Sequence, residues 1–229
     1  MSQPPQDGGI ATSGSGLFLS FEGIDGSGKS TQARLLADAL RQEGHAVVLT
    51  REPGGSPGAE EIRALVLQGD PDRWSAETEI LLFTAARRDH LERTIQPALN
   101  RGAVVICERF ADSTRMYQGL SRGDLREVVD QLHDLMIGVE PDVTLLIDMD
   151  PEIGLARAKS RRGIEERFED FGADLQRKMR AGFLDLARDD PSRVRVIDGA
   201  REPEIVASDV LAVARSALRK RTGARSVEK

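Results

Sequence analysis

The stretch GIDGSGKST, residues 23–31, has the residue types and spacing of a phosphate-binding loop. Gly23, Gly28, Lys29 and Ser30 satisfy the pattern G-x-x-x-x-G-K-S/T. Glycines let consecutive backbone N–H groups turn inward toward an anion, and the helix that follows adds the positive end of its dipole. In such a loop the lysine reaches the β- and γ-phosphates, and the serine hydroxyl binds Mg²⁺. The alternative is a glycine-rich turn that binds nothing.

The sequence around this loop supports the phosphate-binding interpretation. LFLSF, residues 17–21, is an apolar run of strand length, and residues 29–44 have the pattern of a helix closed by a glycine. Strand, loop and helix in this order are the context that the motif requires. We therefore predict that the chain binds a nucleoside triphosphate through the whole loop: Gly23, Ile24, Asp25, Gly26, Ser27, Gly28, Lys29, Ser30 and Thr31.

The rest of the sequence alternates short apolar runs with helical patterns. Further strands are predicted at 45–50, 103–107, 143–149 and 194–198, and helices at 75–102, 150–162 and 202–220. This alternation is typical of an α/β fold whose parallel sheet carries helices on both faces. Ligands of such sheets bind beyond the carboxyl ends of the strands. The site is therefore expected in the segments that directly follow the strands: residues 23–30, 51–55 and 108–117, and from Asp198 onward.

Length, charge and cysteine content limit the classes of protein to which this chain can belong. The chain has 229 residues and a net charge of −6, which fits one domain and gives the surface as a whole no attraction for nucleic acid. No apolar run is long enough to span a membrane. Cys107 is the only cysteine, so no internal disulfide can form; we expect it to be a buried small hydrophobe in a cytoplasmic protein. We expect a disordered extension over residues 1–16, one domain over 17–219 and a basic tail over 220–229.

A phosphate-binding loop serves GTPase switches, ATPase motors and small-molecule kinases alike. The chain has no N-K-x-D stretch to read guanine, and it is small and acidic for a motor that acts on DNA. A kinase needs a second pocket for its acceptor, together with cations that neutralise the transferred phosphoryl group. Phe83 and Arg87 lie four residues apart on one predicted helix, and a ring beside a guanidinium suits a planar base. The alternative, which spacing alone favours, is a core phenylalanine and a solvated surface arginine.

Two further segments carry charges suited to phosphoryl transfer. Glu108 and Arg109 directly follow the third predicted strand, where they could hold Mg²⁺ and an acceptor phosphate or be ordinary surface residues. Five basic residues then fall within eleven positions: Arg157, Lys159, Arg161, Arg162 and Arg167. They form either a solvated helix face or a lid that closes over the triphosphate and excludes water.

Five segments together resemble bacterial thymidylate kinase, in that family's order and at about its spacing: FEGIDGSGKSTQ (21–32), TREPGGS (50–56), LLFTAARRDH (81–90), ERFADSTRMYQG (108–119) and RGIEERFED (162–170). The match extends from Leu17 to about Leu218. The resemblance implies an α/β P-loop kinase fold, with a five-stranded parallel sheet, helices on both faces and a short mobile lid at about 157–170. It also implies a homodimer that uses ATP and Mg²⁺ to phosphorylate dTMP, giving dTDP and ADP in dTTP synthesis.

The resemblance also implies roles for residues of the acceptor site. Phe83 matches the phenylalanine that stacks on thymine, and Arg87 matches the arginine that hydrogen-bonds the base. Arg109 matches the arginine that grips the acceptor phosphate, which Arg51 would also approach. The positions that contact the base and screen for a deoxyribose correspond here to Thr114 and Tyr117, followed by Gln118 as a further substrate-binding residue.

Catalytic and metal-binding roles follow from the same resemblance. The phosphate-binding loop has no arginine at its variable positions, which resembles the family branch whose catalytic arginine comes from the lid. We predict Arg161 for that role, with Arg162 nearly equal and Arg157 as a further ATP contact. The predicted catalytic set is Lys29, Arg109, Arg161 and Asp25, and the predicted Mg²⁺ set is Ser30, Glu108 and Asp25. Glu108 departs from the family's usual aspartate, and its extra methylene shifts the carboxylate.

Two alternative functions stay open at this point. One is a kinase for another nucleoside monophosphate, which a panel of acceptors would distinguish from an enzyme that acts on dTMP. The other is a non-catalytic switch or assembly module, which would bind ATP and hydrolyse it slowly without phosphorylating a small molecule.

Overall fold

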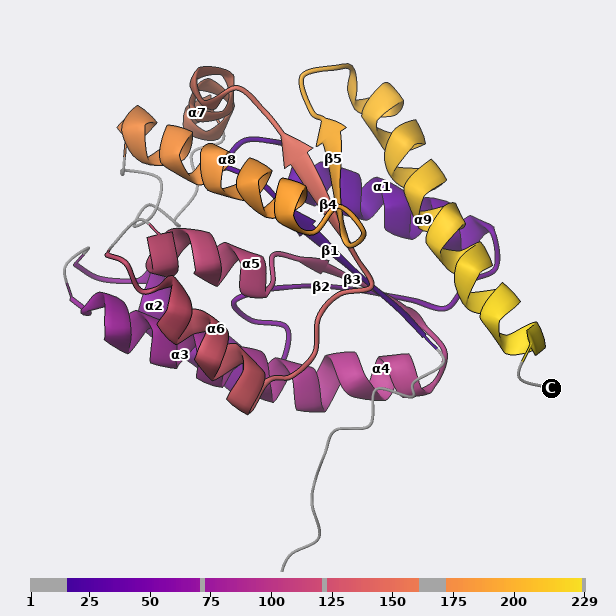
Figure 1. The fold of residues 1–229 in the computed structure, drawn as a ribbon, viewed down its shortest axis with the longest axis horizontal. Helices are drawn as coiled ribbons and strands as arrows, with labels where there is room; N and C mark the ends of the chain where they lie inside the picture. The colour runs from indigo at the N-terminus through magenta and orange to yellow at the C-terminus, as the bar shows by residue number, and fades with distance from the viewer. Residues whose placement is uncertain (1–15, 71–72, 121–122, 161–171, 228–229) are drawn as a thin grey trace, which may run out of the picture.

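The computed structural model describes residues 16–70, 73–120, 123–160 and 172–227 (Figure 1). Residues 1–15 of the extension predicted at 1–16 lie outside these ranges, as do the lid arginines Arg161, Arg162 and Arg167. Among the described helices, none combines the length and the apolar character that crossing a membrane requires.

A five-stranded parallel sheet lies at the centre of the molecule (Figure 1). Its strands are β1 (Leu17–Glu22), β2 (Val47–Arg51), β3 (Val104–Glu108), β4 (Val143–Asp148) and β5 (Val194–Asp198), in the order β2-β3-β1-β4-β5. The predicted fold class is confirmed, as are all five strands. Phe21 and Arg51 both pair with Glu108, the last residue of β3. The segments that follow β1, β2 and β3 therefore start side by side at one edge of the sheet.

Helices cover both faces of this sheet (Figure 1). On one face, α1 (Lys29–Gln42) and α9 (Pro203–Val227) pack against side chains that alternate along β1, among them Leu19 and Phe21. Phe18 points to the opposite face, which η1 (Leu91–Ile95) and α4 (Gln96–Asn100) cover as the continuation of α3 (Ala76–His90). The side chains of β1 thus follow the two-residue period of a strand that is buried on both faces.

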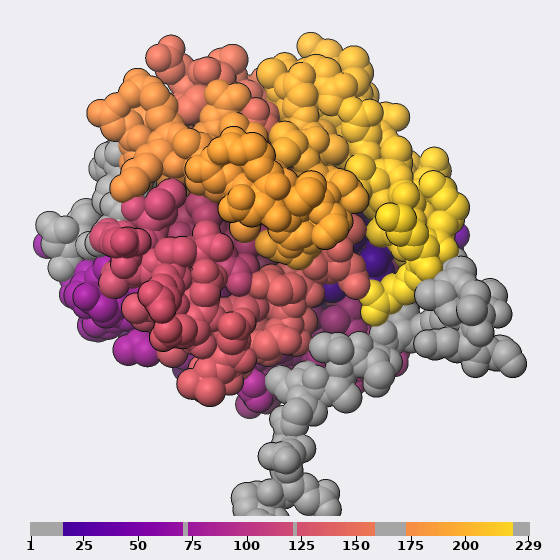
Figure 2. Space-filling view, in the orientation of Figure 1, coloured from indigo at the N-terminus to yellow at the C-terminus, as the bar shows by residue number. Residues whose placement is uncertain are grey.

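The other helical segments connect these layers or lie beside them: α2 (Pro57–Leu67), α5 (Ala111–Thr114), η2 (Arg115–Leu120), α6 (Arg126–Met136), α7 (Pro151–Ser160) and α8 (Gly172–Asp189). Figure 2 shows α8 and the α5–α6 region covering most of the strands from the viewer's side. The sequence-based prediction missed α6 and α8.

Two predicted helices differ from the observed ones. The helix predicted at 75–102 begins as expected, because the Ser75 hydroxyl accepts a hydrogen bond from the Thr78 amide at 3.2 Å. Its continuation, however, is π-helical over Leu91–Ile95 before α4 begins. The helix predicted to end at residue 220 continues to Val227, so it includes most of the predicted basic tail. No proline interrupts this segment, and arginine and alanine favour a helix.

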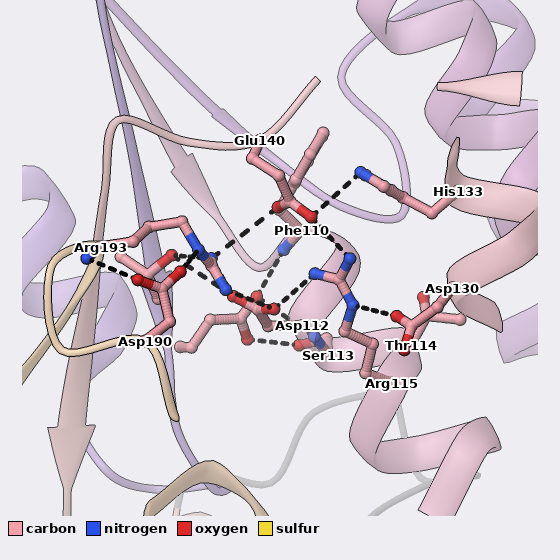
Figure 3. A network of polar contacts seen from close by, with 12 residues as sticks. Phe110, Asp112, Ser113, Thr114, Arg115, Asp130, His133, Glu140, Asp190 and Arg193 are labelled. Carbon is pink, nitrogen blue, oxygen red and sulfur yellow. Dashed lines mark hydrogen bonds and ion pairs between the residues drawn. The ribbon is translucent and has the colours of Figure 1, made fainter. Parts of the chain in front are cut away.

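A buried ionic network fixes the segment after β3 to the rest of the fold (Figure 3). The Arg115 guanidinium donates to Asp112 at 2.7 Å, to Asp130 on α6 at 2.7 Å and to Glu140 at 2.6 Å. Arg193, from the connection between α8 and β5, donates to Asp112 at 2.7 Å. Asp112 and Arg115 are almost fully buried, so each depends on its partners for charge compensation. The network thus positions the start of η2, which contributes to the site described below.

Replacing Arg115→Met should lower the free energy of unfolding by about 3 kcal/mol, because it removes the buried cation shared by three carboxylates and leaves buried Asp112 with Arg193 alone. Arg126→Met is the matched control, since Arg126 also pairs with Asp130 but at the surface; it should cost at most about 1 kcal/mol. Urea unfolding of both variants measures the two losses, and equal losses would contradict the role assigned to the buried network.

Candidate active site

The loop after β1 wraps around the N-terminus of α1. Gly28 has a φ of 101° and leads directly into the helix, which begins at Lys29. Gly26 has a φ of 75°, and a Cβ atom at this position would lie 2.0 Å from the Gly154 carbonyl oxygen of α7. Glycine is thus required by conformation at both positions, and at Gly26 also by the close approach of α7. The geometry is that of a loop whose backbone surrounds an anion at a helix N-terminus.

Lys29 is buried inside this loop. Its ammonium group donates to the carbonyl oxygens of Gly23 at 2.9 Å and Ile24 at 2.7 Å. Burial, together with the nearby charge of Arg109, lowers the pKa of Lys29 to about 8. The carboxylates of Asp25, Glu108 and Glu22 partly offset this lowering, and a phosphate placed in the loop would add further negative charge beside the ammonium group.

A cavity of about 310 Å³ opens beside the loop, at the carboxyl edge of the sheet. Many predicted site residues line it. The end near the loop contains Asp25, Ser30, Arg51, Glu108 and Arg109. Phe83, Arg87, Thr114 and Gln118 also line it, at the far end, and Tyr117 lies between the two groups because its hydroxyl contacts both Arg109 and Asp25. Segments that follow three different strands therefore meet in one cavity, as the parallel topology requires.

Arg109 is the central cation of the cavity. Its backbone has a φ of 66°, a left-handed conformation that is uncommon for residues other than glycine. Its guanidinium pairs with the Asp25 carboxylate and donates to the Tyr117 hydroxyl at 3.1 Å and to the Ser113 hydroxyl at 3.1 Å. Strained residues of this kind persist where surrounding contacts fix them, and they cluster at functional sites.

Asp25 supplies the negative charge opposite Arg109. Its carboxylate also accepts hydrogen bonds from the Tyr117 hydroxyl at 2.9 Å and from the Gln176 amide of α8 at 3.1 Å. Burial alone raises the pKa of Asp25, but the charges of Arg109 and Lys29 and these hydrogen bonds hold it below its usual value. Asp25 is therefore an ionised group whose oxygens are engaged by protein donors.

Ser30 and Glu108 could hold a magnesium ion. The Ser30 hydroxyl donates to the Glu108 carboxylate at 2.7 Å, so the predicted pair is in direct contact despite lying 78 residues apart. A hydroxyl and a carboxylate are hard oxygen ligands of the kind that Mg²⁺ prefers, and their chemistry fits the predicted ion. Asp25, the third predicted ligand, contacts Arg109 instead.

Arg87 is buried at the far end of the cavity. It donates through Nε to Glu52 at 2.7 Å and through Nη2 to the Thr114 hydroxyl at 2.9 Å, and its guanidinium lies 5.1 Å from the centre of the Phe110 ring. The alternative of a solvated Arg87 is therefore wrong. Phe83 is half-buried and lines the same end of the cavity, one helical turn away.

Other predicted site residues lie at the edge of the cavity or away from it. Arg51 is half-exposed and pairs with Glu60 at 3.2 Å. Gln118 is buried and donates to Glu79 at 3.2 Å. Arg157 is exposed on α7, outside the described residues that line the cavity. Thr31 is half-buried in the first turn of α1.

Sequence reasoning missed Glu52, Gln176 and Glu22. Glu52 lies within the TREPGGS segment, and that motif was an available signal. Gln176 contacts Asp25 across 151 residues, and nothing in its local sequence indicates this contact. Glu22 ends β1 as a charged residue after an apolar run, which was also an available signal.

Comparison with known proteins agrees with this arrangement. The thymidylate kinase family model matches residues 21–210. The chain belongs to the thymidylate kinase family. It is 79% identical over 198 residues to the thymidylate kinase of Ruegeria pomeroyi, which covers 86% of this chain and 94% of that protein. It is 66% identical over 197 residues to the thymidylate kinase of Dinoroseobacter shibae, covering 86% and 95% of the two chains.

A solved structure of another thymidylate kinase has the same fold. The Ehrlichia chaffeensis protein superposes with a TM-score of 0.72 at 36% identity, covering 87% of this chain and 98% of that one. The family predicted from five sequence segments is thus confirmed. The roles of single residues in this chain stay predictions, which the contacts above support by bringing those residues together.

Glu22 links the start of the phosphate-binding loop to the segment after β3. It accepts hydrogen bonds from the Phe110 amide at 2.7 Å and from the Ser113 hydroxyl at 2.6 Å. Complete burial and the nearby charge of Asp112 raise the pKa of Glu22 to about 7. Between pH 4.5 and 7 the folded state therefore holds a proton that the unfolded state has lost, so this group makes folding less favourable as the pH rises.

Replacing Glu22→Gln should remove this pH dependence, because the amide can still accept from the Phe110 amide and donate to the Ser113 hydroxyl. The free energy of unfolding of the variant, relative to the unchanged protein, should rise by about 2–3 kcal/mol between pH 5 and pH 8. Urea unfolding at intervals of one pH unit measures it. A difference that stays constant over this range would contradict the protonated Glu22.

Proposed function

We propose that this chain transfers the γ-phosphoryl group of ATP to the 5′-phosphate of dTMP, giving dTDP and ADP. The observation that carries the proposal is the single cavity that joins a phosphate-binding loop to a buried arginine and an aromatic ring. The loop end suits the triphosphate, and the ring and guanidinium at the far end suit a planar base. Membership of the thymidylate kinase family supports thymine as that base.

The acceptor phosphate lies at Arg109 in this proposal. An oxygen of the dTMP phosphate attacks the γ-phosphorus of ATP, and the bond from that phosphorus to the β-phosphate oxygen breaks, so that ADP leaves. The attacking oxygen already carries charge and needs no strong general base, so positioning and charge neutralisation provide most of the catalysis. Arg109 holds the acceptor, and Asp25 keeps the guanidinium oriented until the acceptor arrives.

Lys29 stabilises the negative charge that spreads over the transferred group. Ser30 and Glu108 hold the magnesium ion, which when bound neutralises charge on the phosphate oxygens. Arg161 and Arg162 of the predicted lid, with Arg157 on α7, complete the proposed contacts to ATP.

Phe83 and Arg87 read the base, with Thr114 and Tyr117 beside them and Gln118 as a further contact. Arg87 offers N–H donors, which match a carbonyl oxygen of thymine and are repelled by the amino group of cytosine. Tyr117 lies between Arg109 and the base end, where its ring limits the space around the deoxyribose.

The direct test is ADP release with Mg-ATP and a panel of acceptors: dTMP, dUMP, AMP, CMP, GMP and none. We expect release to depend on dTMP, with dTDP as the product. Dependence on another acceptor would keep the kinase and overturn the roles of Phe83, Arg87 and Thr114. Hydrolysis without an acceptor requirement would indicate the non-catalytic switch instead.

Replacing Lys29→Ala should reduce kcat by about 10²–10³-fold, while the affinity for dTMP changes little, because Lys29 acts on the phosphates of ATP and not on dTMP. Lys178→Ala, an exposed lysine on α8, is the matched control and should keep normal turnover. Steady-state kinetics and calorimetric dTMP binding separate the two effects, and unchanged turnover in Lys29→Ala would refute the assignment.

We also propose that the chain works as a cytoplasmic homodimer that associates through α3 and α6. Leu81 of α3 is 57% exposed, and Leu135 and Met136 of α6 are 78% and 42% exposed. Arg88 of α3 donates to the Met136 carbonyl at 2.7 Å, which places the two helices side by side. Exposed apolar side chains that lie together are typical of an interface between subunits.

Light scattering should therefore give twice the chain mass. Leu135→Glu should give a monomer, because a second copy would bury an unpaired charge at that position. Ile205→Glu on α9, an equally apolar but remote position that is 50% exposed, should remain dimeric. A dimer that persists in Leu135→Glu would exclude this face as the interface.

A further inference from the structure

A chain of hydrogen bonds continues from the base end of the cavity into the protein interior. The Glu52 carboxylate, which accepts from Arg87 Nε at 2.7 Å, also contacts His90 Nδ1 at 3.1 Å. His90 Nε2 in turn lies 2.7 Å from the Thr50 hydroxyl. His90 is fully buried, and both His90 and Thr50 lie behind the residues that line the cavity. The chain therefore connects β2 and α3 to the guanidinium that faces the ligand.

These contacts determine the orientation of the guanidinium. Nε of Arg87 is held by Glu52 and Nη2 by Thr114, and the planar group has no further rotation once two of its nitrogens are fixed. Among the described residues, Nη1 of Arg87 has no hydrogen-bond partner, and the side chain lines the cavity. One donor edge is thereby presented toward the cavity in a fixed direction.

Arg87 and Glu52 also need each other for charge balance. Only 4% of the Arg87 side chain and 5% of the Glu52 side chain are exposed. If Arg87 were its single partner, the buried Glu52 carboxylate could rotate about its side-chain bonds. Because the two groups are paired, the Arg87 guanidinium would then change its orientation as well. The bond from His90 to the second oxygen of Glu52 removes that freedom.

We propose that His90, held by Thr50, is a positioning residue that sets substrate affinity and base selectivity through Glu52 and Arg87. The proposal rests on the function given above, in which Arg87 reads the base. His90 touches no ligand; it acts by keeping the donor edge of Arg87 aimed at a carbonyl oxygen. Loss of His90 should therefore reduce the enzyme's preference for dTMP over dCMP, and not only the stability of the fold.

The backbone of the TREPGGS segment supports this role. A Cβ atom on Gly55 would lie 2.4 Å from both His90 Nε2 and the Thr50 hydroxyl oxygen. Gly55 has a φ of 86° and is held by the Thr94 hydroxyl, which donates to its carbonyl oxygen at 2.7 Å. The loop thus packs directly on His90 and Thr50, and any side chain at position 55 would displace the groups that hold Glu52 through His90.

The same cluster contains Cys107, and its ligand atom lies within 4.8 Å of those of Glu52 and His90. These three residue types can bind a metal ion, but here the Arg87 guanidinium already pairs with Glu52, and a second cation at the same carboxylate would be repelled. Burial raises the pKa of the Cys107 thiol, and the thiol donates to the Arg109 carbonyl at 3.0 Å. The geometry favours a hydrogen-bond chain over a metal site.

The test compares two substitutions of His90 with a control in the full-length protein. His90→Leu keeps a similar volume and removes both hydrogen bonds, whereas His90→Asn keeps an amide at the position of Nδ1 and can still donate to Glu52. Ser56→Ala is the matched control, because it removes the 2.6 Å hydrogen bond from the same loop to Asp89 of the same helix without touching the chain to Arg87.

For His90→Leu we expect the KM for dTMP to rise about tenfold, while the KM for ATP is unchanged and kcat stays within about threefold. The preference for dTMP over dCMP should fall by a similar factor. His90→Asn should recover most of both effects, and Ser56→Ala should show neither. Equal rises in both KM values, or an equal effect of Ser56→Ala, would overturn the proposal by indicating a general structural role.

A second measurement is independent of activity. Hydrogen exchange of the Arg87 Nε–H group, followed by NMR, should be about tenfold faster in His90→Leu than in His90→Asn or the unchanged protein. If the unchanged protein does not phosphorylate dTMP, the proposed function fails, but this exchange rate still tests the positioning. If His90→Leu does not fold, Thr50→Val should show the same pattern with a smaller change of about threefold. Exchange that is unaffected in the folded variants would overturn the proposal.

Discussion

Burial of positive charge at the carboxyl edge of the sheet is the constraint on which the structure of the site depends. Phosphoryl transfer needs cations in a cavity that excludes water, yet an isolated buried cation is costly before any phosphate is present. The protein resolves this by giving each cation a partner of its own. Lys29 donates to carbonyl oxygens of its loop, Arg109 pairs with Asp25, and Arg87 pairs with Glu52.

The two arginine pairs differ in a way that matches their proposed roles. The Arg109 and Asp25 side chains are 19% and 17% exposed, so an incoming phosphate can reach the guanidinium and replace the carboxylate. The Arg87 and Glu52 side chains are 4% and 5% exposed, so we expect this pair to persist when a ligand binds. Arg109 is therefore able to exchange its carboxylate partner for a phosphate, whereas Arg87 keeps a fixed orientation. Rigid groups that recognise the base and exchangeable groups that hold the phosphate together give selectivity without slowing the chemical step.

Features of the fold and site that depend on local sequence pattern or on parallel topology could be predicted from the sequence. The loop at 23–31, the five strands and the meeting of Ser30 with Glu108 all follow from the motif and from the rule that ligands bind at the carboxyl edge. Helix α6 was missed although its apolar residues recur at helical spacing, so that signal was present and overlooked.

For Arg87, spacing alone could not distinguish a buried from a solvated side chain, because burial depends on Glu52, which lies 35 residues away. The left-handed backbone of Arg109 and the contact of Gln176 with Asp25 arise from tertiary packing and have no local signature.

The most direct test of this account is a crystal structure with dTMP bound. We expect Arg109 to have left Asp25 for the 5′-phosphate, while the hydrogen bond between Arg87 and Glu52 persists and Arg87 donates to a carbonyl oxygen of thymine. A complex in which Arg109 stays paired with Asp25, or in which the base lies away from Phe83 and Arg87, would contradict the division between an exchangeable and a fixed arginine.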